Sequence, residues 1–198
     1  MEKKPLPAIC AFTGGRPLYF VLLLIFSLAT MILLGSKPAD TLESLQSGMK
    51  GPDFALRSVD GKTENFARIK GGKLTILLFW STWSPDSDKA LKQMERLYDQ
   101  YKKRGLSVMA VDVDGQEITD RTIARIKSKL DRLKISFPAS IDYGLVTFHD
   151  YGVIAVPSTV ILNKDRVIKY VLPGYPLMGS DEMADYIASK FAPAPARS

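Results

Sequence analysis

The sequence predicts one α/β domain with a central mixed β-sheet and helices on both faces, preceded by one N-terminal transmembrane helix. From residue 74 onward, apolar segments of strand length alternate with longer segments of helical periodicity, and two adjacent strands and a last helix follow. Residues 18–35 form eighteen residues without a charge, enough to cross a bilayer as a slightly short helix. The chain has 198 residues, 46% of them hydrophobic, which suffices for the core of one domain of ordinary size.

The predicted membrane segment also sets the orientation of the chain. Lys3, Lys4 and Arg16 precede residues 18–35, whereas the nearest basic residues behind them are Lys37 and Lys50. This bias predicts a cytoplasmic tail over 1–17, and a single-pass protein of the inner membrane whose domain is periplasmic or extracellular. A cleavable signal peptide is the alternative, but the apolar run is longer than usual and no small-x-small cleavage pattern follows it.

The remaining boundaries follow from composition. Residues 36–52 are polar and rich in Pro and Gly, which is typical of a tether. We expect the folded domain over 53–191 and a disordered Ala- and Pro-rich tail over 192–198.

Charge and cysteine content exclude several functions. Residues 1–50 hold five basic and three acidic side chains, and residues 51–198 hold 22 and 18 with both signs interspersed, which argues against a nucleic-acid partner. The only cysteine is Cys10, ahead of the membrane segment. The domain therefore has no disulfide, no thiolate metal site and no thiol nucleophile, and we expect no cofactor and no metal. Palmitoylation of Cys10 is one alternative, but nothing else in the tail supports lipidation and an ordinary free thiol is favoured.

The first half of the domain predicts a hairpin, a strand and a long helix. Residues 54–58 and 62–64 flank a turn at Asp60-Gly61, and residues 66–70 form one helical turn that Gly71-Gly72 ends. Residues 74–80 lack polar alternation, as expected for a strand covered on both faces. Residues 84–104 have apolar side chains at helical spacing, and Gly105 ends this helix.

The second half predicts further strands and helices in alternation. We expect a strand over 106–113, a helix over 118–133, a short strand over 139–141, a short helix or turn over 144–151, strands over 158–163 and 166–171, and a helix over 181–191. The only histidine, His149, is interpreted as structural, because one His without thiols or carboxylates builds no metal site.

The helix over 118–133 has a basic outer face that allows two interpretations. Its members are Arg121, Arg125, Lys127, Lys129, Arg132 and Lys134. Such a face could bind anionic lipid or an acidic partner. A solvated face is favoured, because Asp120 and Asp131 interrupt it.

Two motifs carry a resemblance to a known family. Residues 79–87 are Phe-Trp-Ser-Thr-Trp-Ser-Pro-Asp-Ser, and residues 153–159 are Val-Ile-Ala-Val-Pro-Ser-Thr. Over roughly residues 50–191 the chain resembles the thioredoxin-like family, and most closely its membrane-anchored TlpA and ResA type, which typically has Phe-Trp-Ala-Thr-Trp-Cys-Pro-Pro-Cys at the first motif. The resemblance implies a thioredoxin-like fold in which Pro157 is cis and faces the turn at 81–84.

The chain departs from the family at both cysteines, which are replaced by Ser84 and Ser87. Thiol-disulfide exchange needs a thiolate and a second, resolving thiol. A serine would need a neighbouring general base, and none is close in the sequence. Leu78 also stands where thioredoxins proper hold a buried acid. Peroxiredoxin and copper-chaperone functions of this fold need a cysteine in the same segment.

A structural interpretation explains the serines without catalysis. Ser84 suits a helix N-cap, Pro85 suits the first helical position, and Asp86 and Asp88 complement the helix dipole. We therefore expect Ser84 and Ser87 to be capping and surface residues and assign no catalytic residue.

The resemblance implies a binding groove formed by Trp83, Pro85, Val156 and Pro157. The first hypothesis is a membrane-tethered, redox-inactive module that binds an unknown protein or peptide partner outside the cytoplasm; the process implied by the family is envelope protein maturation, such as cytochrome c assembly. The second is an oxidoreductase whose drifted motif works with an external thiol. The third is a structural subunit of a membrane complex, recruited through residues 18–35 and the basic helix.

Overall fold

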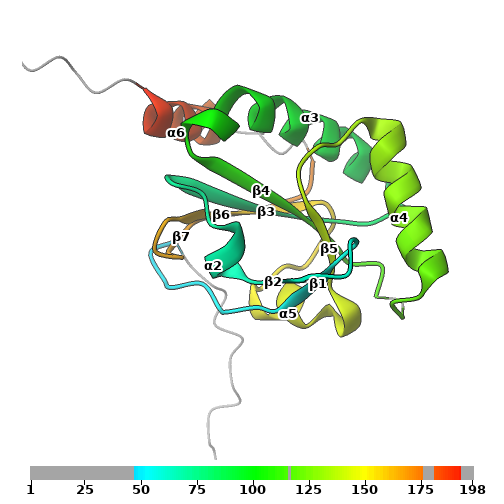
Figure 1. The fold of residues 1–198 in the computed structure, drawn as a ribbon. Helices are drawn as coiled ribbons and strands as arrows, with labels where there is room; N and C mark the ends of the chain where they lie inside the picture. The colour runs from blue at the N-terminus through cyan, green and yellow to red at the C-terminus, as the bar shows by residue number, and fades with distance from the viewer. Residues whose placement is uncertain (1–46, 116, 176–180, 193–198) are drawn as a thin grey trace, which may run out of the picture. The chain divides into compact units, whose positions relative to one another are not determined.

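The computed structural model describes residues 47–115, 117–175 and 181–192 (Figure 1). All of them belong to one compact unit over Leu42–Ser198. The predicted cytoplasmic tail, the anchor over 18–35 and most of the tether lie outside the described residues. Within the described ranges, no helix has the length and apolar character needed to cross a membrane.

Seven strands form one mixed sheet in the order β2-β1-β5-β4-β3-β6-β7. Their bounds are β1 Leu56–Ser58, β2 Thr63–Glu64, β3 Leu74–Trp80, β4 Leu106–Asp112, β5 Ala139–Ile141, β6 Ser158–Asn163 and β7 Ile168–Pro173. The three central strands β3, β4 and β5 are parallel, and the other pairs are antiparallel. The predicted mixed sheet and the hairpin of β1 and β2 are confirmed.

Helices cover both faces of this sheet, as predicted (Figure 1). The helices are α2 Phe66–Ile69, α3 Pro85–Tyr101, α4 Asp120–Leu133, α5 Val146–Asp150 and α6 Asp181–Phe191, with 3-10 turns η1 Lys102–Arg104 and η2 Tyr143–Leu145. One core lies under α3, α4 and α6, and the other lies under α2 and α5. Successive residues of β3 belong to opposite cores and all seven are buried, because side chains alternate across a strand.

Two helix boundaries differ from the sequence prediction for local reasons. The helix predicted over 84–104 ends at Tyr101 and continues as η1, which Gly105 terminates in the left-handed conformation. Helix α4 begins at Asp120 rather than at residue 118, because the side chain of Thr119 caps it by accepting from the Thr122 N–H.

Residues 47–51, which the sequence analysis assigned to the tether, lie against the start of β7. Ser47 Oγ donates to the Lys169 carbonyl over 2.9 Å, and Ile168 N–H donates to the Met49 carbonyl over 2.8 Å. Ordered pairing of the domain therefore begins ahead of Asp53.

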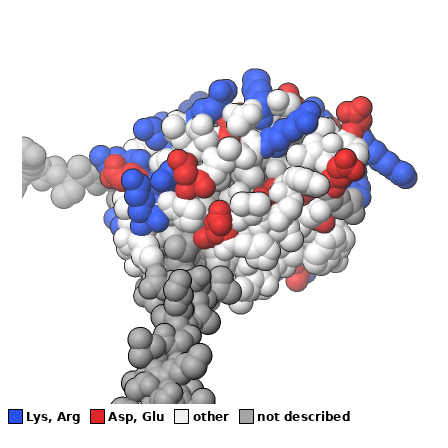
Figure 2. Space-filling view, turned by 90° about the horizontal axis from the view of Figure 1, so that it is seen from below, with Lys and Arg blue, Asp and Glu red and all other residues white. Residues whose placement is uncertain are grey.

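Charged side chains of both signs surround a largely uncharged area on the face seen in Figure 2. No continuous field of one sign covers this view. The charge pattern that matters for the site lies on α4 and is described below.

Candidate functional site: the motif turn and the cis-proline loop

The motif turn, residues 81–84, connects the end of β3 to the start of α3. Ser84 has an extended backbone and its Oγ accepts a hydrogen bond from the Ser87 N–H over 3.3 Å. Pro85 occupies the first helical position, and Asp86 and Asp88 lie in the first turn. The predicted capping role of Ser84 is confirmed.

The expectation that both serines are surface residues is wrong. Ser84 is 6% exposed and Ser87 is fully buried. The Ser87 hydroxyl points back under the motif turn, where its Oγ accepts from the Ser81 N–H over 3.2 Å. Local capping rules cannot show this burial, because it depends on how the motif turn folds over the first turn of α3.

Neither serine hydroxyl has a base beside it. The described hydrogen bonds of both Oγ atoms come from backbone N–H groups, and no described carboxylate or imidazole bonds to them. His149 lies on α5, a helix of the opposite core. A serine nucleophile needs a base within hydrogen-bond reach, so the described site does not activate Ser84 or Ser87. The described residues also contain no group of His, Cys, Asp and Glu that could hold a metal.

The cis-proline loop, residues 152–157, precedes β6 and lies beside the motif turn. Phe79 on β3 pairs with Ser158 on β6, so the antiparallel register places Trp80 and the motif turn next to Pro157 and the residues before it. The Val156–Pro157 peptide bond is cis, as the resemblance implied. The Pro157 carbonyl accepts from the Gly174 N–H over 2.7 Å, whereas no described residue hydrogen-bonds to the backbone of Val156.

Exposed apolar side chains occur on both segments. Trp83 on the motif turn is 70% exposed, and Ile154 on the cis-proline loop is 85% exposed. Pro85 is exposed, Val156 is half-buried and Pro157 is buried. The structure thus brings together the two segments that carry the predicted groove residues, and leaves apolar surface and a backbone edge open between them.

Asp114 and Lys129 form a polar clamp that holds the motif turn from the side of α4, and the sequence did not predict it. Asp114 accepts two hydrogen bonds from Thr82, one from its N–H over 2.9 Å and one from its hydroxyl over 2.5 Å. Lys129 Nζ donates to the Thr82 carbonyl over 2.5 Å and pairs with Asp88 over 2.5 Å. All three polar groups of Thr82 are therefore bonded to side chains more than thirty residues away. The only signal in the sequence is the Asp at 112 and again at 114, where a strand ends.

The prediction that Lys129 belongs to a solvated face is wrong, because its contacts with Thr82 and Asp88 bury most of its side chain. Its side chain is 10% exposed, and that of Arg125 is 45% exposed and pairs with Asp114 over 2.9 Å. The carboxylates that pair with Lys129 and Arg125, which are Asp88 and Asp114, lie on the side of α4 that faces the motif turn. By contrast with Lys129, Lys127 on another side of α4 pairs with Asp60, and these two side chains are 44% and 69% exposed.

Asp112 is a buried carboxyl group at the end of β4. It is 1% exposed and lies opposite Trp80 in the parallel register, on the face of the sheet that also carries Leu78. Desolvation is the main cause that raises the pKa of Asp112 to about 7, and the neighbouring Asp114 charge adds to it. The Asp114 N–H, Arg125 and Lys129 act in the opposite direction. The Asp112 Oδ2 atom and the indole N–H of Trp80 are both buried without a hydrogen-bond partner among the described residues.

A raised pKa has a defined consequence for stability. The folded state holds the proton of Asp112 more tightly than the unfolded state, whose carboxyl titrates near 3.8. The stabilisation from this group is complete below that ordinary pKa and is lost as the pH rises through about 7.

Comparison with known proteins identifies the family. Residues 47–171 match the model of the AhpC/TSA family. The thiol-disulfide oxidoreductase ResA of Bacillus cereus is 30% identical over 152 residues, which cover 76% of this chain and 84% of the relative. The thioredoxin-like protein YneN of Bacillus subtilis is 30% identical over 130 residues, 66% of this chain and 73% of the relative.

Solved structures show the same fold at lower identity. The thioredoxin domain of a thiol-disulfide oxidoreductase from Bacteroides vulgatus superposes with a TM-score of 0.60 at 18% identity, covering 73% of this chain and 99% of that domain. A secreted disulfide oxidoreductase of Mycobacterium tuberculosis gives a TM-score of 0.55 at 18% identity, over 76% and 99% of the two chains. With the two motif segments, the register and the cis-proline in place, the chain belongs to the thioredoxin-like AhpC/TSA family and is a homologue of the ResA and YneN proteins.

Proposed function

We propose that this chain is a membrane-tethered thioredoxin-like module that binds a polypeptide outside the cytoplasm and performs no thiol-disulfide exchange with its own side chains. The proposed groove lies between Trp83 and the backbone of Val156. Two observations carry it: Trp83 is 70% exposed, and no described residue hydrogen-bonds to the backbone of Val156, at a site whose two cysteine positions are serines.

The chemical part of the proposal rests on the missing sulfur. Exchange begins with attack of a thiolate on a disulfide and ends with a second thiol that resolves the mixed disulfide. Ser84 and Ser87 offer neither group, their hydroxyls accept from backbone N–H groups, and Cys10 precedes the tether. The relative ResA is named a thiol-disulfide oxidoreductase, so we propose that this chain shares its fold but not its reaction.

The binding part rests on the cis-proline loop. An extended peptide can add to an exposed backbone edge, where main-chain hydrogen bonds supply affinity and neighbouring side chains supply selectivity. Val156 offers such an edge, since no described residue bonds to its N–H or C=O. Trp83, at 70% exposure, offers a large apolar surface beside it. The process we propose is envelope protein maturation, such as cytochrome c assembly.

A site-specific photo-crosslinker tests the groove. The full chain carries a photoreactive amino acid in place of Ile154, and cells are irradiated before the membranes are solubilised. We expect a discrete crosslinked adduct that disappears when Trp83→Ala is added. Tyr143→Ala is the matched control, because Tyr143 is also an exposed aromatic residue, at 59%, but lies on η2 beyond β5.

Two results would contradict the proposal. An adduct that persists in Trp83→Ala, or is lost equally in Tyr143→Ala, would mean that the groove is not the binding site. Reduction of insulin disulfides by the purified chain above the rate in buffer would instead support an oxidoreductase that works with an external thiol.

A further inference from the structure

We infer that the polypeptide bound at the groove carries acidic side chains that lie on a basic strip along α4. The basic strip consists of Arg121, Arg125, Lys129 and Arg132. This inference rests on the proposed function and adds the charge of the partner to it.

The spacing of the basic strip places its four members on one side of the helix. Residues four apart, and then three apart, recur on the same face of an α-helix. The contacts agree, since Lys129 reaches the Thr82 carbonyl and Arg132 approaches Asp88 on α3 to 3.6 Å. The motif turn therefore meets the basic strip where Lys129 contacts Thr82, one residue from Trp83, and the basic strip extends from Lys129 along α4 to Arg121 in one direction and to Arg132 in the other.

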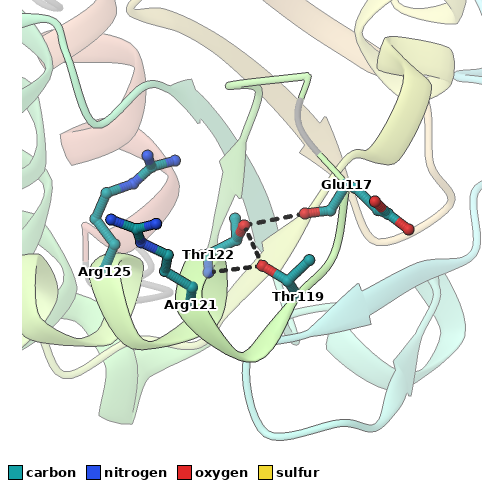
Figure 3. A pocket seen from close by; sticks show the side chains of 5 residues that line it. All are labelled: Glu117, Thr119, Arg121, Thr122 and Arg125. Carbon is teal, nitrogen blue, oxygen red and sulfur yellow. Dashed lines mark hydrogen bonds between the residues drawn. The ribbon is translucent and has the colours of Figure 1, made fainter.

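Two surface pockets lie along the basic strip. One of about 270 Å³ is lined by Thr82, Arg125, Ser128, Lys129 and Arg132. The other, of about 590 Å³, is lined by Glu117, Thr119, Arg121, Thr122 and Arg125 (Figure 3). Arg125 belongs to both pockets, which makes them neighbours.

The exposed charge of the basic strip is positive. Among the ion pairs of the described residues, Asp88 and Asp114 are the carboxylates paired with its members, so in these pairs two negative charges face three members of the basic strip. The side chain of Asp114 is only 2% exposed and that of Asp88 is 29% exposed, whereas that of Arg132 is 68% exposed.

Glu117 does not offset this charge at the arginines. Figure 3 shows Arg121 and Arg125 extending to one side of the start of α4, while the Glu117 carboxylate points away beyond Thr119 and Thr122. Arg121 and Arg125 line one of the two pockets, and Arg125 and Arg132 line the other; carboxylates are complementary ligands for such guanidinium groups.

The length of the basic strip fits a short extended peptide. Arg132 follows Arg121 by eleven positions, which is about 16 Å along a helix axis. An extended segment of about five residues spans that distance and directs alternate side chains to one side. A polypeptide that leaves the groove past Trp83 can thus place two or three Asp or Glu side chains along the basic strip.

A selection of random peptides tests this inference. The probe is a library of random twelve-residue peptides, selected on the full chain in detergent micelles. We expect selected peptides to be enriched in Asp and Glu over the unselected library and to depend on Trp83. For a selected peptide made synthetically, the double variant Arg121→Gln, Arg132→Gln should bind about three- to thirtyfold more weakly, since each lost pair is a partly exposed ion pair.

The matched control removes two positive charges outside the basic strip, one on α4 and one at its C-cap. Lys127→Gln with Lys134→Gln should leave the affinity unchanged within about twofold, because such exposed charges contribute little when distant from the ligand.

The possible results separate the inference from the proposed function. Selected peptides that depend on Trp83 without acidic enrichment, or an equal loss in the control variant, would overturn the inference and leave the groove intact. A selection that returns no peptide dependent on Trp83 would overturn the proposed function. Displacement of the peptide by phosphatidylglycerol vesicles at equal negative charge would assign the basic strip to lipid and also overturn the inference.

Discussion

Replacing Lys129 by Met tests whether α4 holds the motif turn. Met keeps most of the volume of the side chain but removes the ammonium group that bonds to the Thr82 carbonyl and to Asp88, each over 2.5 Å. The side chain of Lys129 is 10% exposed, so water cannot replace these contacts fully.

The magnitude follows from those contacts. The hydrogen bond from Lys129 to the Thr82 carbonyl contributes about 1.5–3 kcal/mol because its donor is charged, and the partly exposed ion pair with Asp88 adds under about 1 kcal/mol. Asp88 is 29% exposed and keeps Arg132 nearby, which lowers the loss on that side. We therefore expect the free energy of unfolding to fall by about 2–3 kcal/mol, a shift of the urea midpoint of about 1 M at a typical denaturant dependence.

Lys127→Met is the matched control two residues away. Lys127 and Asp60 are 44% and 69% exposed, and such a surface pair contributes under about 1 kcal/mol. The assay is urea unfolding of the full chain, followed by tryptophan fluorescence, which changes on unfolding because Trp80 is fully buried in the folded state. Equal losses in the two variants would refute the idea that burial of the Lys129 contacts holds the motif turn.

Three further variants test other parts of the structure. The free energy of unfolding of Asp112→Asn, relative to that of the wild type, should increase by about 2–3 kcal/mol between pH 5 and pH 8, because only the folded wild type has a carboxyl group that loses its proton in this range. A difference between the two proteins that stays constant in urea unfolding at the two pH values would contradict the raised pKa. Gly71→Ala should destabilise by at least about 1–3 kcal/mol, since its Cβ would overlap the Leu74 carbonyl oxygen and lie 2.6 Å from that of Gly105. Gly72→Ala, whose Cβ would approach nothing closer than 3.7 Å, should change the unfolding midpoint little. Ser84→Cys with Ser87→Cys should form a reducible disulfide and reduce insulin, and a double variant that folds but stays inert would mean that the site lacks more than sulfur.

Much of the fold and part of the site could be predicted from the sequence, because they depend on neighbours along the chain. The uninterrupted apolar run of residues 74–80 requires cover on both faces, and the structure buries all seven residues. Ser84 followed by Pro85 is a local helix start, and its cap forms as expected. The absence of cysteine from the domain is a property of the sequence alone, and it limits the chemistry of the motif turn before any coordinate is known.

Only the tertiary structure decided which polar groups meet at the motif turn. Thr82, Asp114 and Lys129 come from three separate segments, and nothing in their local sequence distinguishes Lys129 from Lys127. Helical periodicity places a residue on a face but does not state what lies opposite that face. The packing of α4 beside the motif turn buries most of the Lys129 side chain, leaves Lys127 partly exposed and brings Arg132 close to Asp88 on α3. Each of these outcomes depends on elements far apart in the chain.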